Sequence, residues 1–344
     1  MTAMMDIWKD TAQPWEGRRQ EIIDLLCREE YGFLPPKPET LTWETVSEDD
    51  RFCAGKAVLR QVILTASWAD KRYSFPIYVC LKNSAKPVPF VVNIGFAPDI
   101  VNQYLPIEEL CDLGISVLYF CYEDISSDNW DFSNGLAGLL FPDGKRNPDS
   151  PGKLALWAWA AQRVMDYARS LACLDFAHAG VAGHSRLGKT ALLAGAADQR
   201  FTHVFANESG CCGAAVSRGK EGETIRDICR QFGYWFCESF QQYAGHEEDL
   251  PFDQHFLLGA IAPRKVCVGS AAGDTWAGPM QEFHACVLAA EVYEKLGLSG
   301  LNAPDRLPVP GDCFQTGHIG YHLRGGTHYF SREDWQKYAA CLVK

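Results

Sequence analysis

The chain has 344 residues, of which 47% are hydrophobic and 22% are charged, a composition typical of a globular protein with a large core. Its formal net charge of −11 repels polyanions, which excludes nucleic acid as an expected partner. The sequence has no run of roughly 18 apolar residues, the length that a membrane-spanning helix needs, so no membrane partner is expected.

The first ten residues lack a basic segment followed by an apolar one, so they are not expected to be a signal peptide. A cytoplasmic location follows for the chain as written, and a secreted one if a leader has been trimmed. The 14 cysteines are scattered without a Cys-x-x-Cys pair, which predicts free thiols in a reducing compartment.

The N-terminal region is expected to form a helix and a β-hairpin. Residues 15–31 place apolar side chains on one helical face, and a glycine followed by two prolines ends this helix. Two apolar runs, 57–66 and 73–81, are separated by a short polar segment, a pattern that predicts an antiparallel hairpin.

Strands and helices alternate over the rest of the chain. Continuous apolar runs, rich in β-branched and aromatic residues, are typical of strands buried on both faces of a parallel sheet. We expect strands at 88–94, 115–122, 179–182, 202–206, 265–271 and 317–324. We expect helices at 154–171, from 188 onward, at 280–296 and at 332–342. This alternation predicts a doubly wound α/β sheet.

Two long segments interrupt the alternation. Residues 124–153 are polar and too long for a plain connection, so they are expected to shape the rim of a site. Residues 208–254 form an insertion that is rich in aromatic side chains. This insertion is expected to be either a lid or substrate wall, or an additional patch of helical core.

The segment 179–190 carries the strongest functional signal. A strand of small residues runs into Gly183-His184-Ser185, and a helical pattern follows, which is the context of a nucleophile elbow with Ser185 at its apex. The common elbow is Gly-x-Ser-x-Gly, whereas here the second glycine comes one position later, at Gly188. The alternative is a plain strand-to-helix connection in which Ser185 only caps the helix.

Candidate partners for Ser185 follow later strands. In α/β-hydrolases the order along the chain is serine, acid, histidine. Asp274 follows the strand at 265–271, and His328 follows the last strand, so position alone favours Asp274 as the acid and His328 as the base. Glu208, which follows the strand before, is a second candidate acid.

These patterns favour the α/β-hydrolase fold. An antiparallel start, followed by a parallel run with a serine elbow in mid-chain, predicts a three-layer sandwich with a mostly parallel central sheet and an antiparallel N-terminal hairpin. Residues 1–344 are expected to form one catalytic domain, in which about 1–85 carry the N-terminal helix and hairpin and about 208–254 the insertion.

Four segments of the chain together resemble the glucuronoyl esterases, carbohydrate esterase family 15. The elbow Gly-His-Ser-Arg-Leu-Gly-Lys is similar to the Gly-Cys-Ser-Arg-x-Gly-Lys elbow of that family, and it accounts for the displaced second glycine. The four segments are 183–189, 207–213, 274–277 and 320–328. The resemblance covers roughly residues 85–344.

The resemblance implies a serine esterase that uses no metal and no cofactor. Members of the family cleave the ester between 4-O-methyl-glucuronic acid on xylan and alcohols of lignin. Ser185 would be the nucleophile and His328 the base. Glu208 matches the usual acid of the family and is therefore favoured over Asp274, which matches the acid of some bacterial members. The expected partner is a uronate ester or oligosaccharide derived from glucuronoxylan, and the expected state is a monomer.

The resemblance also assigns roles to residues around the triad. Arg186 would strengthen the oxyanion hole, and the alternative for it is an ion pair with a structural carboxylate. Lys189 would donate hydrogen bonds to sugar hydroxyls, and Glu223 aligns with a sugar-binding acid of bacterial members. Trp276 would form a wall against the sugar, with core packing as its alternative.

Two positions depart from the pattern of the family. Fungal members join a cysteine at the position of His184 to one at the position of Tyr329, so the resemblance implies that this disulfide is absent here. His184 is not expected to be the base, because the residue before the nucleophile points away from it. Two alternative functions stay open: an acetyl xylan esterase or other carbohydrate esterase with the same triad, and a non-catalytic carbohydrate-binding relative.

Overall fold

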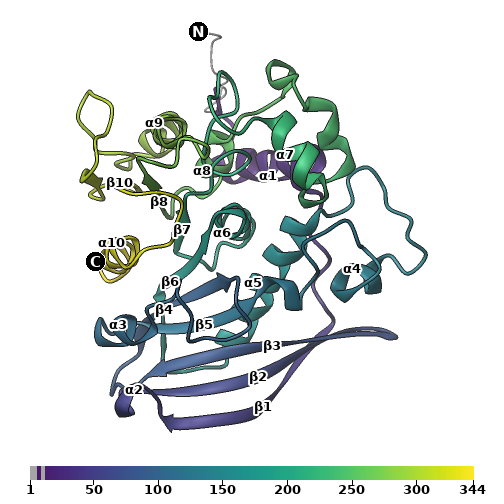
Figure 1. Ribbon diagram of the computed structural model, residues 1–344, viewed down its shortest axis with the longest axis vertical. Helices are drawn as coiled ribbons and strands as arrows, with labels where there is room; N and C mark the ends of the chain where they lie inside the picture. Colours follow the sequence, from purple (N-terminus) through teal and green to yellow (C-terminus); the bar gives the residue numbers. More distant parts are fainter. Residues whose placement is uncertain (1–5, 9–11) are drawn as a thin grey trace.

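A ten-stranded sheet forms the centre of the protein (Figure 1). The computed structural model describes residues 6–8 and 12–344, so most of the segment considered for a signal peptide lies outside the described residues. The strands are β1 (Thr40–Arg51), β2 (Ala57–Trp68), β3 (Lys71–Lys82), β4 (Val88–Gly95), β5 (Ser116–Cys121), β6 (Leu174–His184), β7 (His203–Asn207), β8 (Lys265–Ala271), β9 (Cys313–Phe314) and β10 (Ile319–Arg324).

Helices and single helical turns connect these strands. The α-helices are α1 (Trp15–Leu26), α2 (Phe52–Gly55), α3 (Ile107–Asp112), α4 (Gly135–Leu140), α5 (Lys153–Ala168), α6 (Arg186–Ala197), α7 (Ile225–Phe232), α8 (His255–Gly259), α9 (Pro279–Lys295) and α10 (Arg332–Leu342). Shorter turns are η1 (Cys27–Tyr31), η2 (Tyr122–Asp124), η3 (Gly233–Trp235), η4 (Glu238–Tyr243) and η5 (Glu247–Asp249). Within the described residues, none of the helices has the length and apolar character needed to cross a membrane.

The sheet is parallel in its centre and antiparallel towards both edges. The strand order is β1-β2-β3-β5-β4-β6-β7-β8-β10-β9. Strands β5, β4, β6, β7, β8 and β10 run parallel to their neighbours, whereas β1, β2 and β3 pair antiparallel, β3 pairs antiparallel with β5, and β9 with β10. The expected mostly parallel sheet with an antiparallel start is therefore confirmed.

The N-terminal antiparallel part has three long strands, which lie together at one end of the molecule (Figure 1). The sequence predicted only β2 and β3. Strand β1 carries almost entirely exposed, largely polar residues, and its alternation between apolar and polar positions is confined to residues 40–44. Its backbone pairs with β2 from Thr40–Ser67 onward, and its side chains add packing at Leu41 and at Trp43, whose ring centroid lies 5.4 Å from that of Tyr167.

The sheet separates two hydrophobic layers, which gives the predicted three-layer sandwich. Adjacent residues of a strand point to opposite faces, so Val92 of β4 packs with α5 and α6, whereas Val91 packs with α3 and α10. Nearly all of α5 is buried, because it lies between the sheet and neighbouring helices. The aromatic insertion after β7 contributes Trp235, Phe236 and Phe240 to the same core.

The central strands bring the loops at their carboxyl ends to one edge of the sheet. Because β6, β7, β8 and β10 are parallel neighbours, the turns that follow them meet. These turns carry, in the same order, Ser185, Glu208, Asp274 and His328. Residues far apart in the sequence thus come together because of the strand order.

The elbow turn explains the unusual glycine spacing. Ser185 has φ 58° and ψ −126°, a backbone conformation that residues other than glycine rarely adopt. A Cβ on Gly183 would overlap the carbonyl oxygen of Leu187, and a Cβ on Gly188 would lie 3.1 Å from the carbonyl oxygen of Asn207. Leu187 itself is fully buried. Glycine at 188 therefore suits the close approach of α6 to the turn after β7, because any side chain there would make a tight contact.

We predict that Gly183→Ala lowers the free energy of unfolding by about 1–3 kcal/mol, because backbone in the elbow has to move to accept the methyl group. Denaturant unfolding measures the effect. Gly17→Ala in α1 is the matched control: its Cβ would make an ordinary 3.5 Å contact, so stability should be unchanged or slightly increased. Equal stability of the two variants would contradict the steric account of the elbow.

Candidate active site

A cavity of about 390 Å³ lies at the carboxyl edge of the parallel strands. It brings together all eight site residues that the sequence suggested: Ser185, Arg186, Lys189, Glu208, Glu223, Asp274, Trp276 and His328. Its wall also includes residues that the sequence analysis did not single out as site residues: Ser209, Gly210, Gln231, Phe232, Trp235 and Ala277. The insertion after β7 therefore forms both a wall of this cavity and part of the core.

Ser185 sits at the junction of β6 and α6. Its amide donates a hydrogen bond to the carbonyl of Asn207 at 2.8 Å, which fixes the turn against the end of β7. The residue is half-buried and borders the cavity. The amide of Arg186 belongs to the first turn of α6, where amides have no acceptor within the helix and carry partial positive charge.

His328 lies between two carboxylates that both contact its Nδ1 atom. The distance from Nδ1 to Asp274 Oδ2 is 2.6 Å, and that to Glu208 Oε2 is 3.1 Å. Both acids are buried, whereas the His328 side chain is 44% exposed. The structure therefore places both candidate acids at the same imidazole nitrogen.

The two acids differ in their other contacts. Glu208 Oε2 accepts a hydrogen bond from the amide of Tyr329 at 3.0 Å, and Oε1 forms an ion pair with Arg324. Asp274 Oδ1 accepts a hydrogen bond from the amide of Ala277 at 3.2 Å. Glu208 is thus held on several sides, whereas His328 is the main charged partner of Asp274.

These contacts shift the proton affinities of all three groups. Burial lowers the pKa of His328, but the hydrogen bonds to Asp274 and Glu208 outweigh it and raise the pKa to about 9. Burial raises the pKa of Glu208 to about 7, against the opposing effects of His328 and Arg324. Burial acts in the same direction on Asp274, but its hydrogen bond with His328 prevails and lowers its pKa.

His184 packs against the candidate base, a contact that the sequence did not predict. The ring centroids of His184 and His328 are 4.5 Å apart, and His184 Nδ1 lies 2.7 Å from Asn207 Oδ1. Burial lowers the pKa of His184 to about 3, so this ring is neutral. A neutral ring can support the neighbouring imidazole by packing without repelling its positive charge.

Arg186 forms the ion pair that was its alternative role, and its role at the oxyanion hole stays a prediction. It borders the cavity and also pairs with Asp128. Asp128 further accepts a hydrogen bond from Trp235 Nε1 at 2.7 Å and one from the Tyr122 hydroxyl at 3.1 Å. The guanidinium carbon lies 4.9 Å from the Trp235 ring centroid. Asp128 lies in the polar segment 124–153, where nothing in the sequence distinguishes it from neighbouring acids.

The remaining predicted residues, Lys189, Glu223 and Trp276, also line the cavity. Lys189 is buried, and its Nζ donates to the carbonyl of Ser209. Trp276 is 51% exposed, which argues against its alternative as a core residue. The amide of Glu223 donates to the carbonyl of Trp276 at 2.9 Å, so the two residues share one rim.

One group of side chains has the composition of a metal site. His184, Glu208 and His328 each place a ligand atom within 4.8 Å of the others. The Nδ1 atoms of both histidines already have side-chain partners, which describes a hydrogen-bonded cluster as well. The expectation of a metal-free reaction stays a prediction. The 14 cysteines, all within the described part of the chain, are present as free thiols.

Known proteins with similar sequences are carbohydrate esterases. The family model described as glucuronyl esterase, fungi, matches residues 64–297. Carbohydrate esterase MZ0003 from an unknown prokaryotic organism is 38% identical over 81% of this chain, and the match covers 62% of that relative. The 4-O-methyl-glucuronoyl methylesterase of Podospora anserina is 29% identical over 82% of this chain and is covered to 56%. The chain thus spans about three fifths of the length of these curated relatives.

Solved structures match the whole fold. The glucuronoyl esterase from Solibacter usitatus has a TM-score of 0.90 at 29% identity, covering 100% of this chain and 97% of that one. A promiscuous CE15 esterase from a marine bacterial metagenome has a TM-score of 0.89 at 30% identity, with the same coverage. The fold and the elbow define an α/β-hydrolase. Within that class, the chain belongs to the glucuronoyl esterase family, carbohydrate esterase family 15. The resemblance seen in the sequence is confirmed.

We predict that Asp274→Asn lowers the pKa of His328, because one of the two negative charges that stabilise the imidazolium is removed. A histidine NMR titration measures the shift. Glu208→Gln should act in the same direction and less strongly, since its contact is longer. An unchanged pKa in both variants would contradict the contacts described.

The same raised pKa has a consequence for stability. In the wild type, the contribution of the protonated His328 is complete below the ordinary pKa of about 6.5 and is lost as the pH rises through about 9. The wild type should therefore be more stable than Asp274→Asn at neutral pH, and this difference in the free energy of unfolding should become smaller above pH 9.

Proposed function

We propose that this chain is a serine carboxylester hydrolase that cleaves esters of glucuronic acid or 4-O-methyl-glucuronic acid, as in the lignin–carbohydrate linkages of glucuronoxylan. The observation that carries the proposal is one cavity that gathers a serine in a strained turn, a histidine between two carboxylates, and the cations of Arg186 and Lys189. The names of the relatives, carbohydrate esterase and 4-O-methyl-glucuronoyl methylesterase, support this substrate class.

The proposed reaction is a two-step acyl transfer that needs neither metal nor cofactor. The neutral form of His328, which is the minor form below its pKa of about 9, takes the proton of the Ser185 hydroxyl, and Ser185 Oγ attacks the uronoyl carbonyl carbon. The tetrahedral adduct collapses, and the alcohol leaves with the proton that His328 returns. Water, activated by the same histidine, then attacks the acyl-enzyme and releases the uronic acid.

The positive charge for the developing oxyanion comes from the start of α6. The amide of Arg186 is one donor, since it lies at the positive end of the helix. The guanidinium of Arg186 is the second, and its ion pair with Asp128 and its position over Trp235 hold it in place before the substrate arrives. A fixed cation stabilises charge that exists only in the transition state, so it raises kcat.

We assign Asp274 as the acid that orients His328, with Glu208 as a supporting second carboxylate. Asp274 makes the shorter contact, and its lowered pKa keeps it ionised at neutral pH. The raised pKa of Glu208 makes it the weaker of the two charges near neutrality. The resemblance in sequence favours Glu208, so kinetics of Asp274→Asn beside Glu208→Gln decide between the two.

The sugar would bind along the part of the cavity lined by Lys189, Glu223 and Trp276. Buried Lys189 and Glu223 offer groups for sugar hydroxyls, and exposed Trp276 offers an apolar face with an indole N–H. A half-exposed aromatic wall suits a uronic acid carried on a longer oligosaccharide, because the rest of the chain stays in solvent.

We predict that Ser185→Ala abolishes hydrolysis of benzyl glucuronate, with a loss of kcat on the order of 10⁶-fold, because the nucleophile is removed. Product release is followed by chromatography, and calorimetry checks that the variant still binds the ester. Wild-type cleavage of an aryl acetate without cleavage of the uronate ester would instead indicate an acetyl esterase. Activity on neither ester would contradict the enzyme proposal.

We predict that Arg186→Gln lowers kcat for benzyl glucuronate on the order of 10²-fold, because one oxyanion donor and its charge are lost. Asp128→Asn should lower kcat less, since Arg186 remains but loses its fixed orientation. Steady-state kinetics separate kcat from KM in both variants. A larger loss in Asp128→Asn than in Arg186→Gln would contradict this arrangement.

A further inference from the structure

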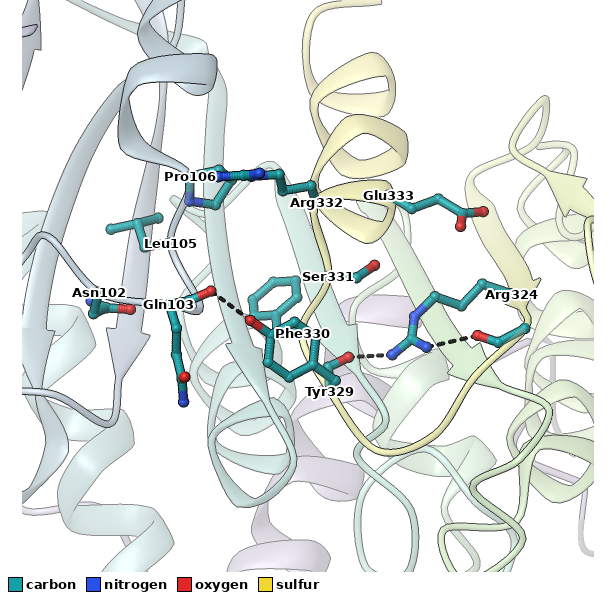
Figure 2. A pocket seen from close by; sticks show the side chains of 11 residues that line it. Asn102, Gln103, Leu105, Pro106, Arg324, Tyr329, Phe330, Ser331, Arg332 and Glu333 are labelled. Atoms are coloured by element: carbon teal, nitrogen blue, oxygen red, sulfur yellow. Dashed lines mark hydrogen bonds between the residues drawn. The ribbon is translucent and has the colours of Figure 1, made fainter.

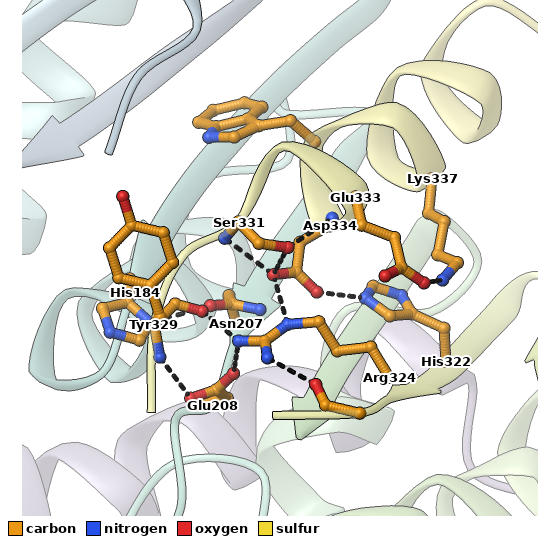
Figure 3. Close-up of polar contacts among 12 residues, drawn as sticks. His184, Asn207, Glu208, His322, Arg324, Tyr329, Ser331, Glu333, Asp334 and Lys337 are labelled. Carbon is orange, nitrogen blue, oxygen red and sulfur yellow. Dashed lines mark hydrogen bonds and ion pairs between the residues drawn. The ribbon is translucent and has the colours of Figure 1, made fainter. Parts of the chain in front are cut away.

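The guanidinium of Arg324, the last residue of β10, contacts two carboxylates and three backbone carbonyls. Nε donates to Asp334 Oδ2 at 2.9 Å, and Nη2 pairs with Glu208 Oε1 (Figure 3). The same side chain donates to the carbonyls of Gly325 at 2.8 Å, of Thr327 at 3.1 Å, and of Tyr329. Figure 2 shows the contact of Arg324 with Tyr329, among the residues that line a separate cavity of about 630 Å³.

These carbonyls belong to the loop that carries the candidate base. Thr327 and Tyr329 are the neighbours of His328 on both sides, so Arg324 holds the backbone directly before and after the imidazole. The amide of Tyr329 donates to Glu208, which closes the ring of contacts. The loop is otherwise exposed from Gly325 to Tyr329, and it buries little apolar surface that could fix its position.

The other end of the ion pair is anchored in a helix. Asp334 is fully buried and accepts hydrogen bonds from the amide and hydroxyl of Ser331, the N-cap of α10, with which it forms a capping box. It also lies 2.8 Å from His322 Nε2. Arg324 is only 5% exposed, so removing its charge would leave buried Asp334 without its cation and buried Glu208 with His328 as its remaining positive partner.

We propose that Arg324 is a positioning residue for the proposed ester hydrolysis: it ties Glu208 and the backbone around His328 to the start of α10, and so holds the imidazole in register with Ser185. This inference rests on the proposed function for its kinetic test and on geometry alone for its spectroscopic test. Arg324 borders the cavity behind the loop and is absent from the residues that line the Ser185 cavity, so it acts through its partners.

Only arginine has the donors for this set of acceptors. Its guanidinium carries five N–H groups in a planar fork, whereas a lysine ammonium carries three on one atom. A lysine at 324 keeps the positive charge but cannot reach Glu208, Asp334 and the loop carbonyls at once. The pair Arg324→Gln and Arg324→Lys therefore separates charge from geometry.

The kinetic test compares both variants with wild type on benzyl glucuronate. We expect kcat to fall on the order of 10²-fold in Arg324→Gln with KM little changed, because a displaced base impairs the reaction rather than substrate binding. Arg324→Lys should recover part of this loss. Arg324→Gln should cost much less in a Glu208→Gln background, because the two residues act through one set of contacts.

The spectroscopic test needs no activity. A histidine Nδ1 proton held by carboxylates gives a low-field NMR resonance that is protected from exchange with water. We expect this resonance of His328 to move upfield and to exchange faster in both variants, more so in Arg324→Gln. Failure of the wild type to cleave uronate esters would overturn the proposed function and leave this readout intact.

Arg163→Gln is the matched control. Arg163 is also a buried arginine with an ion pair, to Asp166 at 2.7 Å, but it lies in α5 away from the cavity. It should lose stability while its kcat and its His328 resonance stay at wild-type values. Wild-type kcat in Arg324→Lys, or losses in Arg324→Gln that add fully to those of Glu208→Gln, would overturn the proposal. If Arg324→Gln does not fold, Arg324→Lys alone decides.

Discussion

The hydrogen bond from the amide of Ser185 to the carbonyl of Asn207 joins the two turns on which the rest of the site depends. Asn207 also contacts His184 through its side chain, and its carbonyl would lie only 3.1 Å from a Cβ at position 188. Because all three contacts need the turn after β7 to lie against the start of α6, the place of the nucleophile is tied to that of Glu208. The site is thus set by backbone contacts, which exist before a substrate binds.

The sequence predicts those strands and turns whose residues carry a clear local pattern. Apolar runs defined β4, β5, β7 and β8, and the small residues around Ser185 defined the elbow. The chain order of serine, acids and histidine then placed four side chains at one edge of the sheet, because parallel strands share their carboxyl edge. Strand β1 escaped prediction, since most of its residues are polar and exposed, and it is held mainly by backbone pairing with β2.

The contacts that hold the site could not be predicted, because they join residues remote in sequence. Asp128 lies 58 positions before Arg186, and Arg324 lies 116 positions after Glu208. Asp128 lies in no pattern that sets it apart from other charged side chains, and Arg324, although it lies in the segment 320–328 that carries the family resemblance, was assigned no role there. The sequence could not distinguish Glu208 from Asp274 as the acid for a related reason. Both carboxylates contact the same atom, Nδ1 of His328.

The exposed strand β1 has a second consequence, for how the sheet meets other molecules. An open sheet ends in unpaired backbone groups that another chain could extend. At one end this protein presents a strand whose exposed side chains include four acids: Glu44, Glu48, Asp49 and Asp50. At the other end it presents β9, which has only two residues. The acidic side chains of the edge strand β1 and the short length of the edge strand β9 both disfavour pairing of this sheet with another sheet edge.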